Sequence, residues 1–457
     1  MTANQLYRRR FLTVSGGAVA AASFQALACR SADQSETGAT RSSSGQNRVG
    51  YGPLQPVRDE TTGLPLLHLP PGFRYLSFGW KGDRLDDGSP TPGAHDGMAA
   101  FEAEGGRVRL VRNHELRAGV AFSGDPVYDG RAGGGTTTIE FDTSSGTVVA
   151  AWPSLAGTAV NCAGGPTPWG TWLSCEETVE GPGDENGYTL PHGYIFEVPV
   201  DGTARAEPYR AMGRFVHEAV SVDPESGIVY ETEDRATAGL YRFLPNQTGR
   251  LAAGGRLEML ALSNRPGADT RTGQRAGQWE PVNWVPIEDP DPEPIDDSSV
   301  YSQGIRNGAA TFARLEGTWS GNGRIYVVST NGGDAEAGQV WEYDPGESRI
   351  RLLYESPDAE VLDMPDNICV SPRGGLVLCE DGGGEDHIRG LTADGEIFTF
   401  AKNNVILAGE RNGLEGDFLD REFAGATFSP DGNWLFVNVQ TPGITFAVTG
   451  PWGEQLI

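Results

Sequence analysis

The stretch "GGLVLCED", residues 374–381, decides the fold once it is compared with the rest of the chain. It opens with two glycines, runs through a short apolar strand and ends in Cys379, Glu380 and Asp381. The same arrangement, a glycine turn and a β-rich strand that becomes polar at a fixed distance, recurs in five segments: "GRVRLVRN" from Gly106, "GTWLSCEE" from Gly170, "GIVYETED" from Gly227, "GRIYVVST" from Gly323 and "GNWLFVNV" from Gly432. Six copies of one unit predict a repeat architecture.

The spacing of the copies predicts the blades of a β-propeller. Successive glycines stand 51 to 96 residues apart, which leaves room for four strands in each interval. In "SVDPESG", "CVSPRGG" and "TFSPDGN" a proline precedes the glycine, as in hairpins between two strands of one blade. The composition agrees, with 64 glycines, 30 prolines and short runs of β-forming residues. We therefore predict an all-β, six-bladed β-propeller over residues 51–457.

The longest interval, between Gly227 and Gly323, contains a Pro/Asp-rich insertion, "QWEPVNWVPIEDPDPEPIDDSSVYSQG", residues 278–304. Long insertions within a compact domain usually have a functional role. We expect this one to cover one mouth of the propeller and not to form a separate domain.

The N-terminus has the features of an export signal. Arg8, Arg9 and Arg10 precede an apolar stretch and then small residues before Cys29, which resembles a twin-arginine signal peptide over residues 1–28. "ALAC" is an imperfect lipoprotein box, so ordinary cleavage and a lipid anchor at Cys29 are alternative outcomes. Residues 29–50 read as a disordered Ser/Thr/Gly linker. We expect export through the twin-arginine machinery, to the periplasm or otherwise out of the cytoplasm. The exported protein would be either free or a lipoprotein tethered to the membrane.

The charge excludes one class of partner. The formal net charge is −27, and removal of residues 1–28, with three arginines and no acidic residue, makes it −30. Nucleic acid is therefore not an expected partner. Such a charge strains a compact fold unless cations neutralise part of it, although a solvated acidic surface is an equal alternative.

The mature chain keeps four cysteines, for which the sequence leaves alternatives open. Cys369 and Cys379 stand symmetrically about Gly374, so they are expected to form a disulfide or a small buried pair across the hairpin. Cys162 and Cys175 could pair in the same way, which would remove Cys162 as a metal ligand.

Rotational symmetry predicts a ring of carboxylates. Residues at one offset from the glycine lie at one depth around the central channel of a propeller. Offset six holds Arg112, Glu176, Glu233, Ser329, Glu380 and Asn438, and offset seven holds Asn113, Glu177, Asp234, Thr330, Asp381 and Val439. Three of the offset-six residues are glutamates. Periodicity alone leaves open whether Glu177, Glu231, Asp234 and Asp381 face the channel or the solvent.

A second polar set lies at the starts of the strands that precede the turns: His95, Asp96, Asn161, Cys162, His217, Glu218, Asp366 and Asn367. These residues begin a strand where its hairpin partner ends, so both sets should lie near the same mouth. Crowded carboxylates stay ionised only if cations hold them, and oxygen ligands suit calcium whereas a thiolate among them suits iron. His217 is a ligand or a hydrogen-bonded core residue, and six histidines in all disfavour a histidine-built zinc site.

Several stretches resemble one family from about residue 50 to the C-terminus: "TGLPLLHLPPGFRY", "TPGAHDGMAAF", "NCAGGPTPWGTWLSCEET", "AMGRFVHEAVSVD", "YETEDR", "DMPDNICVSPRGGLVLCEDG" and "EFAGATFSPDG". They resemble the PhoX-type bacterial alkaline phosphatases, in a shorter form. The resemblance implies a six-bladed propeller, export to the periplasm, and hydrolysis of small phosphorylated substrates at alkaline pH by an axial cluster of iron and calcium ions.

The resemblance and the repeat together give the expected metal ligands: Cys162, Glu176, Glu218, Glu233, Asp366 and Glu380. "NCAGG" points to Cys162 as an iron ligand, and "HEAV" points to Glu218. The basic residues that would hold the phosphate have no secure match in the chain, and Arg235 and Arg306 are the catalytic candidates.

Two other functions stay open at this stage. The chain could be a calcium-containing propeller that binds a ligand without turnover, or a lactonase-like propeller hydrolase, because those enzymes also place acidic side chains around an axial calcium. No serine in a nucleophile elbow occurs, so metal-only chemistry is the coherent form of a phosphatase.

Overall fold

The six glycines of the repeat occupy the turns that the sequence predicts. The structure, a computed structural model, describes residues 49–457 apart from 125, 294, 297 and 454–456. All six glycines have a positive φ, between 68° and 99°, a conformation that glycine adopts without steric cost: Gly106, Gly170, Gly227, Gly323, Gly374 and Gly432. The expected signal peptide (1–28) and nearly all of the linker (29–50) lie outside the described residues.

The described residues form an all-β, propeller-like fold, as predicted. Their helices are short: α2 (Ser299–Arg306) and the 3-10 helices η1 (Glu104–Gly106), η2 (Arg210–Met212) and η3 (Leu251–Ala253). No helix in the described part of the chain is long and apolar enough to cross a membrane.

Two sheets contain the first two copies of the repeat. A four-stranded antiparallel sheet consists of β4 (His95–Ala103), β5 (Arg107–His114), β6 (Gly134–Asp142) and β7 (Thr147–Thr158). A three-stranded sheet consists of β8 (Asn161–Pro166), β9 (Thr171–Glu176) and β10 (Ile195–Pro199).

The third and fourth copies share one nine-stranded sheet. Its first part is β11 (His217–Val222), β12 (Val229–Glu233), β13 (Leu240–Pro245) and β14 (Gly255–Leu262). Its second part is β16 (Leu315–Gly321), β17 (Arg324–Ser329), β18 (Gln339–Asp344) and β19 (Arg349–Glu355). Between them runs β15 (Glu280–Pro286), which pairs with β14 on one side and β19 on the other.

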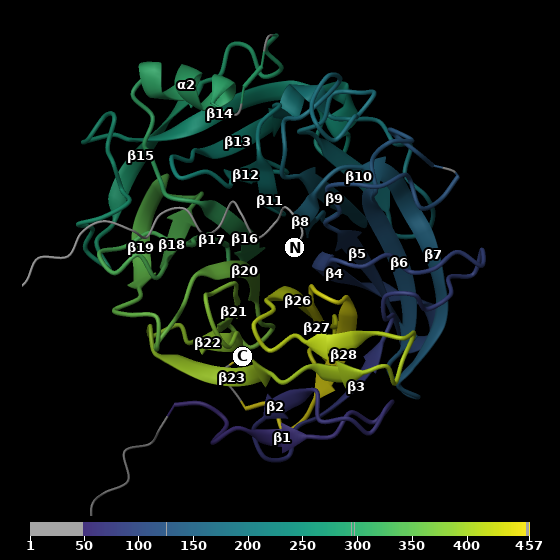
Figure 1. Ribbon diagram of the computed structural model, residues 1–457. Helices are drawn as coiled ribbons and strands as arrows, with labels where there is room; N and C mark the ends of the chain where they lie inside the picture. Colours follow the sequence, from purple (N-terminus) through teal and green to yellow (C-terminus); the bar gives the residue numbers. More distant parts are fainter. Residues whose placement is uncertain (1–48, 125, 294, 297, 454–456) are drawn as a thin grey trace, which may run out of the picture. The chain divides into compact units, whose positions relative to one another are not determined.

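One part of the Pro/Asp-rich insertion forms a strand that the sequence did not predict. Its residues 280–286 are β15, an added strand on the outer side of these two strand sets (Figure 1). Its prolines, Pro281 and Pro286, stand second and last in the strand, where the missing N–H groups interrupt the ladder least. Farther along, Val300 of α2 packs into the hydrophobic cluster beneath β13 and β14.

The last two copies close the fold with help from the N-terminal part of the domain. A six-stranded sheet consists of β20 (Pro365–Val370), β21 (Leu376–Glu380), β22 (His387–Leu391), β23 (Ile397–Asn403), β2 (Leu67–Leu69) and β1 (Gln55–Val57). The final sheet consists of β26 (Phe423–Phe428), β27 (Leu435–Val439), β28 (Ile444–Thr449) and β3 (Arg74–Phe78). A small hairpin of β24 (Ile406–Ala408) and β25 (Glu415–Asp417) precedes it.

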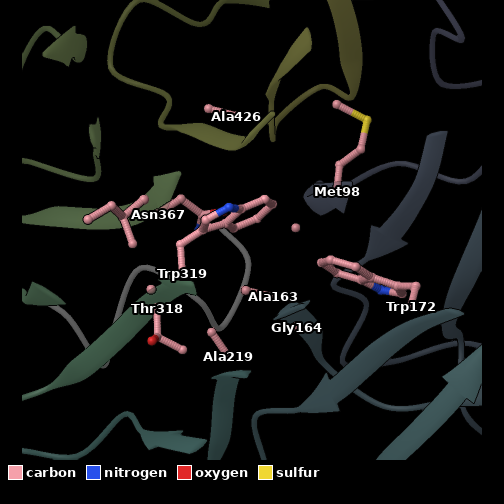
Figure 2. Close-up of a pocket in the computed structure, with 12 residues that line it drawn as sticks. Met98, Ala163, Gly164, Trp172, Ala219, Thr318, Trp319, Asn367 and Ala426 are labelled. Carbon is pink, nitrogen blue, oxygen red and sulfur yellow. The ribbon is translucent and has the colours of Figure 1, made fainter. Parts of the chain in front are cut away.

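The first strand of each copy lies innermost. β4 contacts β8, and the contacts continue through β11, β16, β20 and β26 and return from β26 to β4. We call these six the inner strands, and each copy of the repeat a unit. Figure 1 shows them around a common centre. One small pocket has lining residues from all six inner strands, among them Ala163, Ala219 and Trp319, and Figure 2 shows these side chains converging on it.

Small residues let the inner strands approach one another closely. A Cβ at Gly97 would lie 2.5 Å from the Cα of Ala163, and a Cβ at Gly317 would lie 2.5 Å from the carbonyl oxygen of Asp366. Any larger side chain at either glycine would push two inner strands apart.

Candidate metal and phosphate site

A β-bulge at the start of each inner strand positions the acidic residues. In five units, two residues of the inner strand oppose a single residue of the second strand: 96–97, 162–163, 218–219, 316–317 and 366–367. A bulge re-aims a side chain and is common beside active sites. The first residue of each bulge is an acid or a thiol, namely Asp96, Cys162, Glu218, Glu316 and Asp366.

A backbone hydrogen bond that recurs in all six units brings a second set of residues beside the bulges. In every unit the N–H of the residue after the second strand donates to the carbonyl of the residue before the inner strand, over 2.9–3.2 Å: Glu115 to Ala94, Glu177 to Val160, Asp234 to Val216, Thr330 to Arg314, Asp381 to Met364 and Gln440 to Glu422. This bond fixes the residue after the second strand beside the bulge. Both sets therefore lie at one mouth, as predicted for strand starts and hairpin ends.

Three groups of side chains lie close enough to share an ion. Within each group the ligand atoms all lie within 4.8 Å of one another. The groups are Cys162, Glu177 and Glu218; Asp96, Glu115 and Glu422; and Asp366, Asp381 and Glu422. We call these eight residues the axial cluster. Glu422 belongs to two of the groups, so the two all-oxygen groups are continuous with each other.

Burial and mutual repulsion disfavour the charged forms of the group around the thiol. Burial, and then the neighbouring charges of Glu218 and Glu177, raise the pKa of the Cys162 thiol well above its ordinary value. Burial, followed by the charge of Asp366, raises the pKa of the Glu218 carboxyl well above its ordinary value. These are the surroundings in which a bound cation would restore the ionised forms.

The two all-oxygen groups show the same effect. Burial, and then Glu115, raise the pKa of Asp96, while burial, and then Asp381, raise that of Glu422. Burial, and then the charge of Asp381, raise the pKa of Asp366 to about 7. Carboxylate oxygens at this density are the donor set that hard cations prefer.

Arg314 brings a guanidinium to the edge of the axial cluster. It donates to both carboxylate oxygens of Asp234, from Nε over 2.9 Å and from Nη2 over 3.1 Å, and it also pairs with Glu316. Burial alone would raise the pKa of Asp234, but the pairing with Arg314 outweighs it and the pKa is lowered. Asp234 in turn raises the pKa of Glu177, after burial, which links Arg314 to the group around Cys162.

The structure places Glu176, Glu233 and Glu380 outside the axial cluster. Each closes the loop that leads to the third strand of its unit by accepting a backbone N–H: Gly193 to Glu176 over 2.8 Å, Gly239 to Glu233 over 2.9 Å and His387 to Glu380 over 3.0 Å. Glu176 also pairs with His192 and Glu380 with Arg389. The other three expected ligands, Cys162, Glu218 and Asp366, do lie in the axial cluster.

The physical reason is the two-residue period of a strand. Glu176, Glu233 and Glu380 are the last residues of β9, β12 and β21, and each following residue turns the other way. Glu177 and Asp381 belong to the axial cluster and Asp234 holds Arg314. The residues whose orientation the sequence left open are thus the ones near the axis, except Glu231, which is buried within its sheet.

Of the two arginines predicted as catalytic, Arg306 lies away from the axial cluster. Arg306 ends α2 and is exposed, and α2 packs at the outer side of the sheet. Arg235 follows Asp234, and its carbonyl accepts the backbone N–H of Arg314. His217 donates from Nε2 to the Gly213 carbonyl, as a hydrogen-bonded core histidine does.

The four cysteines among the described residues are free thiols, and all four are buried. Neither disulfide that the sequence left open is present in this part of the chain, and Cys162 keeps its thiol. Cys369 and Cys379 both belong to one hydrophobic cluster, which fits the small buried pair.

Sequence reasoning missed Glu115, Glu316, Glu422 and Arg314. Glu115 lies beyond offsets six and seven, because β5 runs to His114, eight residues beyond Gly106, whereas β9 ends six residues beyond its glycine. Glu316 could have been found, since "LEG" repeats the pattern of "HDG", an acid followed by a small residue. Glu422 and Arg314 each precede an inner strand, a position that no repeated motif marks.

Comparison with known proteins identifies the family. A sequence model described as alkaline phosphatase PhoX matches residues 49–443. The structure of Pseudomonas fluorescens PhoX in complex with vanadate, a transition state analogue, superposes with a TM-score of 0.62 at 16% identity, covering 87% of this chain and 98% of that one. That likeness confirms the propeller-like fold.

Two other solved structures are less similar. A gluconolactonase from Xanthomonas campestris matches with a TM-score of 0.46 at 14% identity, over 88% of this chain and 99% of that one. A virginiamycin B lyase from Staphylococcus aureus matches with a TM-score of 0.39 at 11% identity, over 82% and 99%. No curated protein matched the sequence.

The match over residues 49–443 defines the class of protein as a phosphoric monoester hydrolase. The chain belongs to the alkaline phosphatase PhoX family, as its motifs predicted.

Proposed function

We propose that this phosphatase is metal-dependent and that the axial cluster holds its ions. The observation that carries the proposal is the convergence of seven carboxyl groups and one thiol at a single mouth. The set fits hard and borderline cations: Cys162, Glu177 and Glu218 suit iron, and the two all-oxygen groups suit calcium. In this proposal Glu115, Glu177, Asp381 and Glu422 are the ligands in place of Glu176, Glu233 and Glu380.

We infer that the fold has six blades. The closed cycle of contacts among β4, β8, β11, β16, β20 and β26 supports this count. On this interpretation the nine-stranded sheet is two blades, joined at their outer edges where Glu280 and Pro281 of β15 pair with β19. The last blade combines β26–β28 with β3, so the two ends of the domain close the ring.

The chain's own residues would bind and orient the phosphate monoester. Bound ions would supply Lewis acidity at the phosphoryl oxygens. Asp234 and Glu316 hold the guanidinium of Arg314 in one orientation, and a fixed guanidinium is suited to donate to phosphoryl oxygens as their charge grows. Arg314 therefore takes the role that was expected of Arg235 or Arg306.

The site would suit small phosphorylated substrates and act outside the cytoplasm. The guanidinium of Arg314 beside the axial carboxylates suits a phosphate group. The arginine cluster at residues 8–10 supports export by the twin-arginine route to the periplasm. A lipid anchor at Cys29 is a variant of this proposal.

The test is metal analysis and aryl phosphate hydrolysis by protein exported through its own signal. We expect iron and calcium in the wild type, with activity at alkaline pH that a chelator abolishes and the metals restore. Cys162→Ser should lose iron and activity while the fold is retained. Cys175→Ser, which removes an equally buried thiol outside the axial cluster, is the matched control and should keep both.

The proposal fails if protein with verified iron and calcium hydrolyses no aryl, nucleotide or sugar phosphate at any pH. Full iron retention in Cys162→Ser would return that residue to a structural role.

A further inference from the structure

The bulges that aim the axial side chains also interrupt the strand ladder. The carbonyl groups of Cys162, Glu316 and Asp96 lie in bulges, where two residues of the inner strand share one residue of the second strand and the ladder is interrupted. A buried carbonyl without a donor is costly, so each requires a hydrogen bond from elsewhere. In all three cases a side chain of the preceding unit provides it.

Asn113 supplies the donor for Cys162. The fully buried amide donates from Nδ2 to the Cys162 carbonyl over 3.2 Å and to the Ala163 carbonyl over 2.7 Å. Its Oδ1 accepts from Trp172 Nε1 over 2.9 Å and from Ser174 over 3.0 Å. Because an indole N–H can only donate, these bonds fix the amide with its NH₂ toward the bulge.

Thr232 supplies the donor for Glu316. Its buried hydroxyl accepts the Ala219 N–H over 3.0 Å and donates to the Glu316 carbonyl over 2.6 Å. The hydroxyl therefore ties the inner strand of its own unit to the inner strand of the next.

Asn438 supplies the donor for Asp96 and closes the ring from the last unit to the first. Its Nδ2 donates to the Asp96 carbonyl over 2.7 Å, and its Oδ1 accepts the Thr445 hydroxyl over 2.6 Å. Thr445 in turn accepts from the fully buried Arg112, over 2.6 Å. This chain of hydrogen bonds accounts for a fully buried guanidinium on β5.

The three donors occupy equivalent positions. Asn113, Thr232 and Asn438 each stand one residue before the residue that pairs with the start of the inner strand, which is His114, Glu233 or Val439. We propose that Asn113, Thr232 and Asn438 are positioning residues: each holds a bulged backbone in the next unit, so that Cys162 and Asp96 of the axial cluster, and Glu316, which holds Arg314 at its edge, point to the axis. The proposal rests on the proposed function for the identity of the bound ions.

A chelator titration of the intact, metal-loaded enzyme tests this. Thr232→Val removes the hydroxyl at constant shape, and loss of a partner that orients a metal site weakens metal affinity by about 10–100-fold. Glu316 adjoins the Asp366 group, because Thr330 Oγ1 lies 2.6 Å from the Glu316 carboxylate and 2.8 Å from the Pro365 carbonyl. We therefore expect calcium to leave Thr232→Val at a correspondingly lower EGTA concentration, with kcat lowered more than KM is raised. Thr232→Ser keeps the hydroxyl and should restore both.

Thr136→Val is the matched control. Thr136 shares a buried hydroxyl hydrogen bond of 2.7 Å with Ser154 on the third and fourth strands of the first unit, at a bulge between β6 and β7 and not at an inner-strand bulge. We expect it to lower the unfolding temperature and leave the chelator midpoint unchanged. Asn113→Leu is the second test variant and should release iron more readily than the wild type.

The proposal is overturned if Thr232→Val and Thr136→Val share the wild-type midpoint, or if Thr232→Ser fails to restore it. A wild type without metal would instead overturn the proposed function. In that case amide hydrogen exchange still decides the positioning role, since Thr232→Val must speed exchange at the start of β16 and Thr136→Val must not.

Discussion

Glu380 and Asp381 are neighbours in the chain, yet they serve different parts of the molecule. Glu380 ends β21 and is tied to Arg389 over 2.7 Å and to the backbone of His387 over 3.0 Å. Asp381 lies one residue farther on, within 4.8 Å of ligand atoms of Asp366 and Glu422.

The same contrast separates Glu176 from Glu177 and Glu233 from Asp234. The first residue of each pair closes a loop and the second faces the axial cluster or holds Arg314. In a repeat of β-strands, one step along the chain decides between a structural and a functional carboxylate. Four predictions test this division.

The largest effect is expected on the structural side. Glu380→Gln leaves Arg389 buried without its carboxylate, and breaking one partner of a buried ion pair costs about 3–5 kcal/mol. Denaturant unfolding should show that loss while the metal content of the folded protein stays at the wild-type level. Loss of metal at unchanged stability would contradict the division.

Next is Arg314 on the axial side. Arg314→Ala removes the positioned guanidinium, and removal of one donor to a developing oxyanion lowers kcat by about 10²–10³-fold. Steady-state kinetics on an aryl phosphate, with metal content measured in parallel, checks this. Arg235→Ala serves as the control, and an equal drop in kcat there would transfer the role to Arg235.

Asp381→Asn should weaken metal binding at the group it shares with Asp366 and Glu422. We expect the chelator concentration needed for inactivation to fall by about 10–100-fold, the range known for disturbed metal surroundings. Set beside Glu380→Gln, this variant makes the comparison direct, because the two substitutions remove one charge each at adjacent positions. Identical chelator curves for the two variants would contradict the division between structural and functional carboxylates.

The smallest effect is expected at Arg306. Its side chain is exposed at the end of α2, and surface substitutions usually stay within about 0.5 kcal/mol, or roughly twofold in a rate. Arg306→Ala should therefore keep kcat and KM near the wild-type values. A tenfold change in either would place α2 beside the substrate.

Much of the fold could be predicted, because the glycine turns carry a local signal. Positive φ at Gly170 or Gly374 follows from the turn itself and does not depend on distant contacts. The role of the insertion could not be predicted, since nothing local in residues 280–286 indicates that β14 and β19 would both pair with them.

The site could be predicted in part, because position in a strand is a local signal whereas the orientation of a side chain is not. Asp96, Cys162, Glu218 and Asp366 begin inner strands, and that position alone places them at the mouth. The orientation of Glu176 and Glu177 depends on where β9 ends, which a glycine alignment fixes only to within a residue. Arg314 owes its place to Asp234 in another strand set, a contact across 80 positions of sequence.

Anomalous diffraction from crystals of the exported protein, recorded at the iron edge and at a wavelength sensitive to calcium, tests the central claim most directly. We predict an iron peak in bonding contact with Cys162 Sγ and the carboxylates of Glu177 and Glu218, and calcium peaks at Asp96, Asp366 and Glu422. Metal peaks beside Glu176, Glu233 or Glu380, or an axial cluster without any peak, would contradict it.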